Sequence, residues 1–291
     1  MLLVTGATGN FGKIVIDTLL KNKKSSSNIA ALVRNESKAS DLNGKSLEIR
    51  IGDYNDYESL VVAFKGVDKL LFVSGSDIEN RTNQHKNVVI AAKQAGVKHI
   101  IYTSFVRKNE TDTSPIAFVS SAHIETEKFI KSSGVKYTLL LNALYMDILP
   151  MFMGEKVLET GIFLPAGEGK ASFTTTRDLA EAAANIASDN GHENKEYIMS
   201  NVTNYSLIDV AEILSEISGK KIQYLNPTNQ VFIDTLTKTG VPIEMAMMVG
   251  SFSEAINQGE FETTKTDLER LLGRKPTTLN EFLKSVYNVK K

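Results

Sequence analysis

The chain has 291 residues, of which 42% are hydrophobic and 23% are charged, the composition of a globular protein with one large domain or two coupled ones. Its 33 basic and 34 acidic side chains leave a net charge of -1, which argues against nucleic acid as a partner because that needs a basic face. The sequence contains no cysteine, so disulfides, zinc–thiolate sites, iron–sulfur clusters and thiol nucleophiles are excluded.

The apolar start of the chain predicts a strand and no targeting segment. The run Met1–Val4 is interrupted at Gly6, and no charged segment precedes it as in a signal peptide. No apolar stretch approaches the roughly 20 residues that a membrane helix requires. We therefore expect a cytoplasmic protein that has no membrane partner.

The first half of the chain alternates short aliphatic runs with longer helical patterns. The runs predict strands at Leu2–Thr5, Ile29–Val33, Leu47–Ile51, Lys69–Phe72, His99–Thr103 and Tyr137–Asn142. The helical patterns lie at Gly12–Lys23, Ser37–Asp41, Tyr57–Phe64, Asn83–Ala95 and His123–Lys131. This order predicts an α/β protein with a doubly wound, parallel Rossmann sheet, in which ligands bind beyond the carboxyl ends of the strands.

The pattern changes after about residue 143. Further helices are predicted at Arg177–Ala187, Leu207–Ser218 and Asp267–Leu272, the last with a stop at Gly273, and further strands at Tyr197–Met199 and Lys221–Tyr224. We expect residues 1–150 to form the Rossmann domain and residues 151–291 to form a smaller α/β domain that covers the substrate. Some of the later segments are expected to return to the Rossmann sheet.

Three glycines between the first predicted strand and helix indicate a phosphate site. Gly6, Gly9 and Gly12 stand at G-x-x-G-x-x-G spacing. In such a turn the first glycine allows the tight bend, the second lets the backbone approach a pyrophosphate, and the third allows close helix–strand packing. The helix start then offers free N–H groups to phosphate. The cofactor-binding residues predicted here are Gly6, Thr8, Gly9, Asn10, Phe11 and Gly12. A turn without a ligand is the alternative.

Arg34 ends the second predicted strand, where a protein that prefers NAD usually has an acidic residue. A guanidinium can pair with a 2′-phosphate through two parallel hydrogen bonds, and Lys38 follows one helical turn later. We therefore predict NADPH as the cofactor in preference to NADH. An exposed arginine without a ligand is the alternative.

Two further loops follow strands at the same edge of the predicted sheet. Asp53 and Tyr54 come after the third strand, where a side chain can cover the adenine ring. Ser74, Gly75 and Ser76 come after the fourth strand, where glycine lets the backbone run alongside the cofactor. We assign both groups to cofactor binding, with an ordinary loop as the alternative for each.

Several segments closely resemble the NmrA-like group of atypical short-chain dehydrogenases, and within it the bacterial type-2 NADPH:quinone oxidoreductases. These segments are Thr5–Gly12, Val33–Asn35, Gln84–Val88, Gly96–Lys98, Tyr102–Ser104, His123–Lys128, Asn142–Tyr145, Gly167–Lys170 and Leu271–Thr278. The resemblance covers nearly the whole chain. It implies a Rossmann domain with a small C-terminal domain, NADPH as hydride donor, and a site without flavin. Leu141 departs from the pattern, because related quinone reductases have an arginine there, and this predicts a change in cofactor orientation or acceptor preference.

The catalytic pair of ordinary short-chain dehydrogenases is a tyrosine with a lysine four residues later. Where that pair is expected, the chain has His123 and Glu127. Only Tyr287 has a lysine at this spacing, Lys291, which we interpret as a coincidence. Reduction of a ketone, which requires protonation of an alkoxide, is therefore not expected. A quinone is an activated acceptor, and its reduced anion is a much weaker base.

The candidate donors to a substrate oxygen are His123, Asn142 and Tyr145. The Met- and Phe-bearing segments Tyr145–Met153 and Met245–Phe252 suit an apolar wall for a flat substrate. Structural roles for His123 and Tyr145, and core packing or a dimer contact for the two segments, are the alternatives. We predict no metal site, because the histidines are scattered without ligand spacing.

The sequence thus favours an oxidoreductase that transfers hydride from NADPH to a quinone-like small molecule, or to a similar activated carbonyl, without flavin. One alternative is a non-catalytic NADP(H) sensor that regulates a partner protein, as the resemblance to NmrA-like proteins allows. Another is a reductase of imines or enones on the same scaffold. A homodimer is compatible with each of these interpretations.

Overall fold

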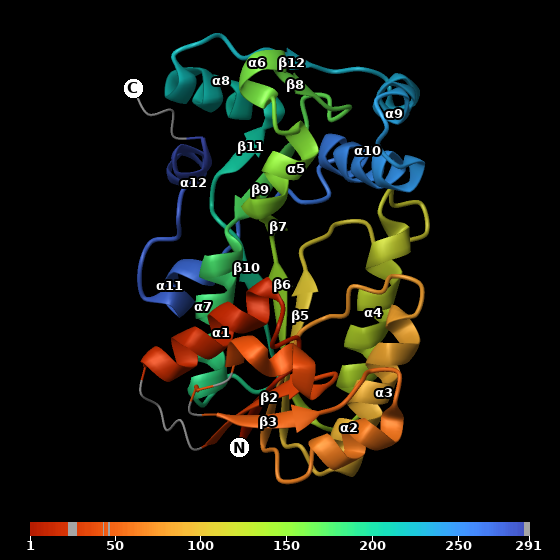
Figure 1. The fold of residues 1–291 in the computed structure, drawn as a ribbon, viewed down its shortest axis with the longest axis vertical. Coiled ribbons are helices and arrows are strands. Elements are labelled where there is room, and N and C mark those ends of the chain that lie inside the picture. Colours follow the sequence, from red (N-terminus) through yellow and green to blue (C-terminus); the bar gives the residue numbers. More distant parts are fainter. Residues whose placement is uncertain (23–27, 43, 46, 288–291) are drawn as a thin grey trace.

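The computed structural model describes residues 1–22, 28–42, 44–45 and 47–287. Seven strands form one sheet in the order β10-β6-β5-β4-β1-β2-β3, and every pairing within it is parallel (Figure 1). The strands are β1 (Leu2–Val4), β2 (Ile29–Val33), β3 (Glu48–Ile51), β4 (Lys69–Phe72), β5 (His99–Phe105), β6 (Lys136–Asn142) and β10 (Lys195–Met199). The predicted doubly wound Rossmann sheet is confirmed. The strand ends differ from the predicted ones by at most two residues.

Helices cover both faces of this sheet (Figure 1). On one face α1 (Asn10–Lys21) packs against α7 (Thr176–Ser188), which in turn contacts α11 (Leu268–Leu272). The other face carries α2 (Tyr57–Ala63), α3 (Arg81–Gln94) and α4 (Ala117–Ser132). Because both faces are covered, β2 is apolar and buried along its whole length.

Most predicted helices differ from the observed ones at their ends, and α3 begins at Arg81 and not at Asn83. α1 begins at Asn10, and the Lys23 of the predicted helix lies outside the described residues. The segment predicted at Ser37–Asp41 is a 3-10 helix, η2 (Glu36–Leu42). α4 begins at Ala117, so His123 lies in the interior of this helix and not at its start.

A second core lies beyond the carboxyl ends of the sheet, in the upper part of Figure 1. Its small sheets, ordered β11-β9-β7 and β12-β8, consist of β7 (Leu144–Tyr145), β8 (Ile162–Phe163), β9 (Lys170–Thr174), β11 (Asn204–Ser206) and β12 (Tyr224–Leu225). Its helices are η3 (Met146–Ile148), α5 (Leu149–Met153), α6 (Val157–Thr160), α8 (Leu207–Ser218), α9 (Asn229–Lys238), α10 (Ile243–Asn257) and α12 (Leu279–Val286). The strand predicted at Lys221–Tyr224 is wrong, because pairing with β8 begins only at Tyr224.

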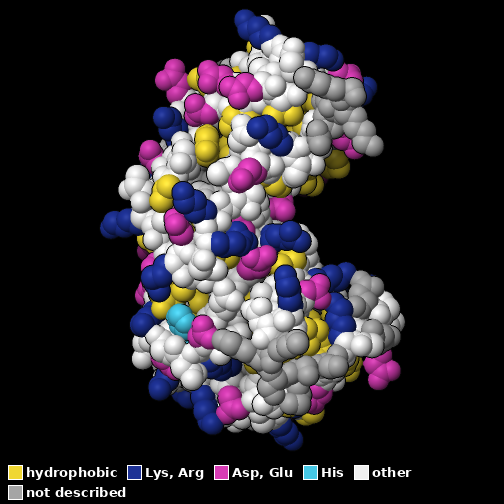
Figure 2. All heavy atoms as spheres, turned by 90° about the vertical axis from the view of Figure 1, so that its left-hand side faces the viewer, with side chains coloured by type: hydrophobic (Ala, Val, Ile, Leu, Met, Phe, Trp, Pro, Cys, Tyr) yellow, Lys and Arg dark blue, Asp and Glu magenta, His cyan; other side chains and the backbone are white. Residues whose placement is uncertain are grey.

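Several later segments return to the Rossmann layer. β10 forms the edge of the main sheet beside β6, and α7 and α11 cover one face of that sheet. The space-filling view shows a notch in the outline between the upper and lower parts, and charges of both signs are interspersed on this face (Figure 2). Among the described residues, no helix is long and apolar enough to cross a membrane.

Candidate active site

A cavity of about 450 Å³ lies at the carboxyl ends of β1, β2, β3 and β4. Its lining includes every residue that the sequence assigns to the cofactor: Gly6, Thr8, Gly9, Asn10, Phe11, Gly12, Arg34, Asp53, Tyr54, Ser74, Gly75 and Ser76. It also includes Asn55, Asp77 and Gln84, which the sequence analysis did not assign. These three are ordinary polar residues of a loop or a helix start, so no local pattern distinguishes them.

The glycine turn brings the start of α1 to this cavity. Gly6 has a φ of 60°, which glycine adopts without strain, and its carbonyl accepts the Gly9 N–H at 2.9 Å. A Cβ on Gly12 would lie 2.3 Å from the same carbonyl oxygen, so only glycine fits where the helix crosses the turn. The first amides of α1, those of Asn10, Phe11 and Gly12, have no acceptor within the helix. They are available to phosphate oxygens.

Substitutions of Gly12 and Gly9 test whether the turn requires glycine for packing, independently of any ligand. We expect Gly12→Ala to lower the free energy of unfolding by about 1–3 kcal/mol, because backbone atoms of the turn must move. Gly9→Ala is the matched control, since its Cβ would lie 3.3 Å from the nearest atom, the Gly6 oxygen. It is expected to cost less than Gly12→Ala, about 0.5–1 kcal/mol, because Gly9 is the N-cap of α1 and alanine is less favourable than glycine there. Urea denaturation checks this, and a Gly12→Ala protein as stable as the wild type would contradict it.

Arg34 and Lys38 line the same cavity at the end of β2. Both side chains are exposed. In the described part of the chain, no acidic side chain forms an ion pair with Arg34. The guanidinium is therefore available to an anionic ligand in the cavity.

Two of the predicted loop residues bond within the protein. The Tyr54 hydroxyl lies 2.9 Å from the Val73 carbonyl oxygen and beside Thr5 Oγ1, so Tyr54 contributes its ring to the cavity. The Gly75 N–H donates to His85 Nε2 at 3.0 Å. This amide is therefore not available to a cofactor, although the loop itself lines the cavity.

A second cavity, of about 300 Å³, adjoins the first at Ser74, which lines both. Its lining brings together the three candidate catalytic residues His123, Asn142 and Tyr145. Its apolar wall comes largely from the two predicted Met- and Phe-bearing segments, through Ile148, Met151, Phe152, Met248 and Phe252. The arrangement suits a flat, apolar ligand with a few directed polar contacts.

A chain of buried hydrogen bonds connects the loop at Gly75 with His123 through His85 and Tyr102. His85 Nε2 accepts the Gly75 N–H, so the hydrogen of the neutral His85 ring is on Nδ1 and is donated to Thr126 Oγ1 at 2.9 Å. Burial lowers the pKa of His85 to about 3, which keeps the ring neutral. The Tyr102 hydroxyl lies 2.7 Å from His123 Nδ1 and also bonds to the Thr126 side chain. When Tyr102 donates to His123, the neutral His123 ring carries its hydrogen on Nε2.

Burial also holds the pKa of His123 well below its usual range, and the positive charges of Arg81 and Arg107 act in the same direction. The ring is therefore neutral near pH 7. Its Nε2 lies 3.5 Å from Arg81 Nη1, which is longer than an ordinary hydrogen bond of about 2.7–3.2 Å. In the tautomer with hydrogen on Nε2, this N–H is available to a ligand in the second cavity.

Asn142 and Tyr145 lie together at the end of β6. Asn142 Nδ2 donates to the Tyr145 hydroxyl at 3.1 Å. Asn142 Oδ1 is buried and has no hydrogen-bond partner among the described residues. Burial raises the pKa of Tyr145 to about 12, so the hydroxyl remains protonated. An unpaired buried acceptor is costly, and a ligand N–H would satisfy it.

Sequence reasoning missed Arg81, the first residue of α3, because the predicted helix starts only at Asn83 and a single arginine at a helix start carries no signal. Its side chain contacts the loop that follows β4, where Arg81 Nε donates to the Gly75 carbonyl at 2.8 Å. Among the described residues that line the second cavity, Arg81 is the only Arg, Lys, Asp or Glu.

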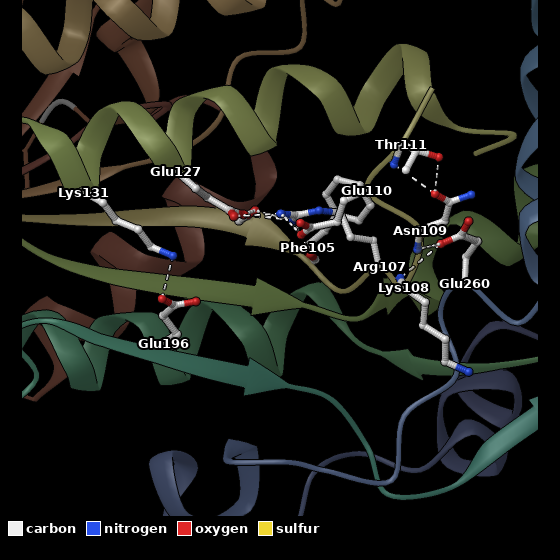
Figure 3. A network of polar contacts seen from close by, with 11 residues as sticks. Phe105, Arg107, Lys108, Asn109, Glu110, Thr111, Glu127, Lys131, Glu196 and Glu260 are labelled. Carbon is white, nitrogen blue, oxygen red and sulfur yellow. Dashed lines mark hydrogen bonds and ion pairs between the residues drawn. The ribbon is translucent and has the colours of Figure 1, made fainter. Parts of the chain in front are cut away.

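Glu127 and Leu141 line neither cavity. Figure 3 shows Glu127 of α4 facing Arg107, with Nη1–Oε1 and Nη2–Oε2 distances of 2.9 and 2.7 Å. Leu141 lines a different cleft together with Glu127 and Glu196, on the opposite face of the strand from Asn142. An arginine at position 141 would meet these carboxylates, so the structure gives no reason for Leu141 to alter cofactor orientation.

Tyr287, the tyrosine of the tyrosine–lysine pair at the end of the chain, lines neither cavity. Tyr287 follows α12 and packs against the second core. Lys291 lies outside the described residues.

Comparison with known proteins agrees with this architecture. The model of the NmrA-like family matches residues 1–283. Quinone oxidoreductase 2 of Escherichia coli is 40% identical over 291 residues, 99% of each chain. The structure of NADPH-dependent quinone oxidoreductase from Escherichia coli, complexed with NADPH, has a TM-score of 0.89 at 37% identity and covers 99% of this chain and 100% of that one. Citrobacter sp. triphenylmethane reductase complexed with NADP(H) has a TM-score of 0.89 at 40% identity, covering 98% and 99%. The chain belongs to the NmrA-like family.

Proposed function

We propose that this protein transfers hydride from NADPH to a quinone, or to a similar activated carbonyl compound, without flavin. The observation that carries the proposal is that two cavities meet at Ser74. The glycine turn lines the first cavity, and the second is apolar with a few hydrogen-bond donors in its lining. The names of the similar proteins support it, since the Escherichia coli relative is a quinone oxidoreductase whose structure contains NADPH.

The residues of the first cavity fit NADPH. The free amides at the start of α1 suit the pyrophosphate, and the close approach at Gly12 shows a turn that leaves no room for a side chain. Arg34, with Lys38 beside it, suits the 2′-phosphate. Asn142 lines the adjoining second cavity, where its unpaired Oδ1 suits the N–H groups of a nicotinamide carboxamide that reaches into it. NADPH bound in this way supplies the hydride.

The second cavity suits the acceptor. Its aromatic and Met side chains pack against a flat ring and exclude water, which strengthens the remaining polar contacts. The Nε2–H of His123 donates to the substrate oxygen on which negative charge develops. His123 thus acts as a neutral donor and does not have to give up its proton.

The direct test is NADPH oxidation with a panel of soluble quinones and no added flavin. We expect quinone-dependent consumption of NADPH, and a decrease in kcat of about 100-fold for His123→Asn. His192→Asn is the matched control, because His192 bonds to the Tyr197 hydroxyl and lines neither cavity. Binding of both NADP+ and NADPH without turnover of any quinone would overturn the proposal in favour of a redox sensor.

The pH dependence tests the protonation state of His123. Its pKa is lowered by burial, so the neutral ring is the main form at every pH above the lowered value, and protonation sets in only in more acidic solution. We expect kcat to be constant from about pH 6 to 8, where an unperturbed histidine titrates. A step in kcat near pH 6.5 that disappears in His123→Asn would show that the ring titrates normally during turnover.

A further inference from the structure

Arg81 is a buried guanidinium without a carboxylate partner. The residue is 7% exposed, and among the described residues no Asp or Glu forms an ion pair with it. Arg107 shows the usual arrangement, because its side chain is 4% exposed and is paired with Glu127. Asp77 is near enough to act on the charge of Arg81 but does not pair with it. Since a buried charge is costly unless it is paired, Arg81 lacks a directly bound negative group, which a ligand can supply.

The geometry around Arg81 indicates that a ligand in the second cavity supplies this negative group. Arg81 Nε is held by the Gly75 carbonyl, which fixes the guanidinium against the loop. Arg81 Nη1 and His123 Nε2 are 3.5 Å apart, which is longer than an ordinary hydrogen bond of about 2.7–3.2 Å. Both residues line the same cavity. A single oxygen atom of a ligand there can accept from both.

We propose that Arg81 is a catalytic residue which, together with His123, holds the substrate oxygen that becomes anionic. This inference rests on the proposed function. A quinone that accepts a hydride gains two electrons and one hydrogen from the C–H bond that breaks in the dihydronicotinamide, and becomes a hydroquinone monoanion. A proton from water then completes the hydroquinone. The guanidinium stabilises the anion before that proton arrives, and it favours acceptors that already carry an anionic oxygen over cationic ones.

Kinetics of Arg81 variants give the first test. We expect Arg81→Gln to lower kcat for a neutral naphthoquinone by about 100-fold, the effect of removing one donor to a developing oxyanion, with NADPH affinity unchanged. Arg81→Lys keeps the charge but not the forked geometry and should recover part of the loss. Arg50→Gln is the matched control, because Arg50 also donates to main-chain carbonyls, at 2.6 Å, but lines neither cavity. An Arg81→Gln enzyme with wild-type kcat would overturn the proposal.

Ligand binding without turnover gives the second test. Calorimetry on the wild-type enzyme–NADPH complex compares 2-naphthoate with its neutral counterpart 2-naphthamide, neither of which is a quinone. We expect the carboxylate to bind at least about tenfold more tightly, as a hydrogen bond to a charged group allows, and Arg81→Gln to remove the difference. Equal affinities in the wild type would refute the anion site even if Arg81→Gln fails to fold. A preference for naphthoate in a protein that reduces no quinone would instead show that the anion site is present and the proposed reaction is wrong.

Discussion

Arg34→Glu is expected to weaken NADPH binding by at least about 100-fold while leaving NADH binding almost unchanged. A hydrogen bond to a charged group contributes about 1.5–3 kcal/mol, and each 1.4 kcal/mol is a factor of about ten in affinity. The substitution removes a guanidinium that lines the cavity at the end of β2 and places a negative charge near the 2′-phosphate. A carboxylate at this position also accepts from the ribose hydroxyls of NADH. Calorimetric titration with both dinucleotides measures the ratio.

The same charge change elsewhere controls for net charge. Arg177→Glu alters an exposed residue of α7 that lines neither cavity, so both affinities should stay at wild-type values. An equal loss for NADPH and NADH in Arg34→Glu would mean that position 34 acts through the shape of the turn. No loss for either dinucleotide would place the 2′-phosphate away from Arg34.

The Rossmann half could be predicted from the sequence because its signals are local. Each strand is a short apolar run with a turn after it, and parallel strands bring the residues after their carboxyl ends to one edge. Gly6, Arg34, Tyr54 and Gly75 are far apart in the chain, yet this rule alone places them around one cavity. The His123 prediction depended instead on the resemblance, since nothing in the local pattern distinguishes this residue.

The second core could not be predicted in the same detail, because most of its strands are too short to show a period and the longer β9 is buried without alternation. β7, β8 and β12 have two residues each, and only the surrounding helices stabilise them. The strand β10 was predictable as a strand, but its position beside β6 depends on pairing across more than fifty residues, for example Tyr197 with Leu140. Arg81 was missed for a related reason, since its burial results from the loop at Gly75 and not from its own neighbours in the chain.

Glu127→Gln is expected to be among the most destabilising conservative substitutions in this protein, although it changes no cavity residue. Glu127 has a side chain that is 9% exposed, and it binds both terminal nitrogens of Arg107 and accepts from the Ser104 hydroxyl. Removing its charge leaves the buried Arg107 guanidinium with the exposed Glu110 as its remaining carboxylate partner, which costs up to about 3–5 kcal/mol. Arg107 Nε already lacks a partner among the described residues. The free energy of unfolding from urea denaturation gives the size of the loss.

Two comparisons decide whether this ion pair is structural. Glu262→Gln removes one partner of the exposed pair with Lys108, whose side chains are 54% and 46% exposed, and should cost at most about 1 kcal/mol. Replacing both buried partners, as Arg107→Met with Glu127→Leu, should restore most of the stability because no unpaired charge remains. The double variant should also keep its kcat with NADPH and a quinone, since neither residue lines the two cavities. If stability returns but turnover does not, then Glu127, at the position where ordinary short-chain dehydrogenases have their catalytic lysine, takes part in the reaction, and its pairing with Arg107 is more than structural.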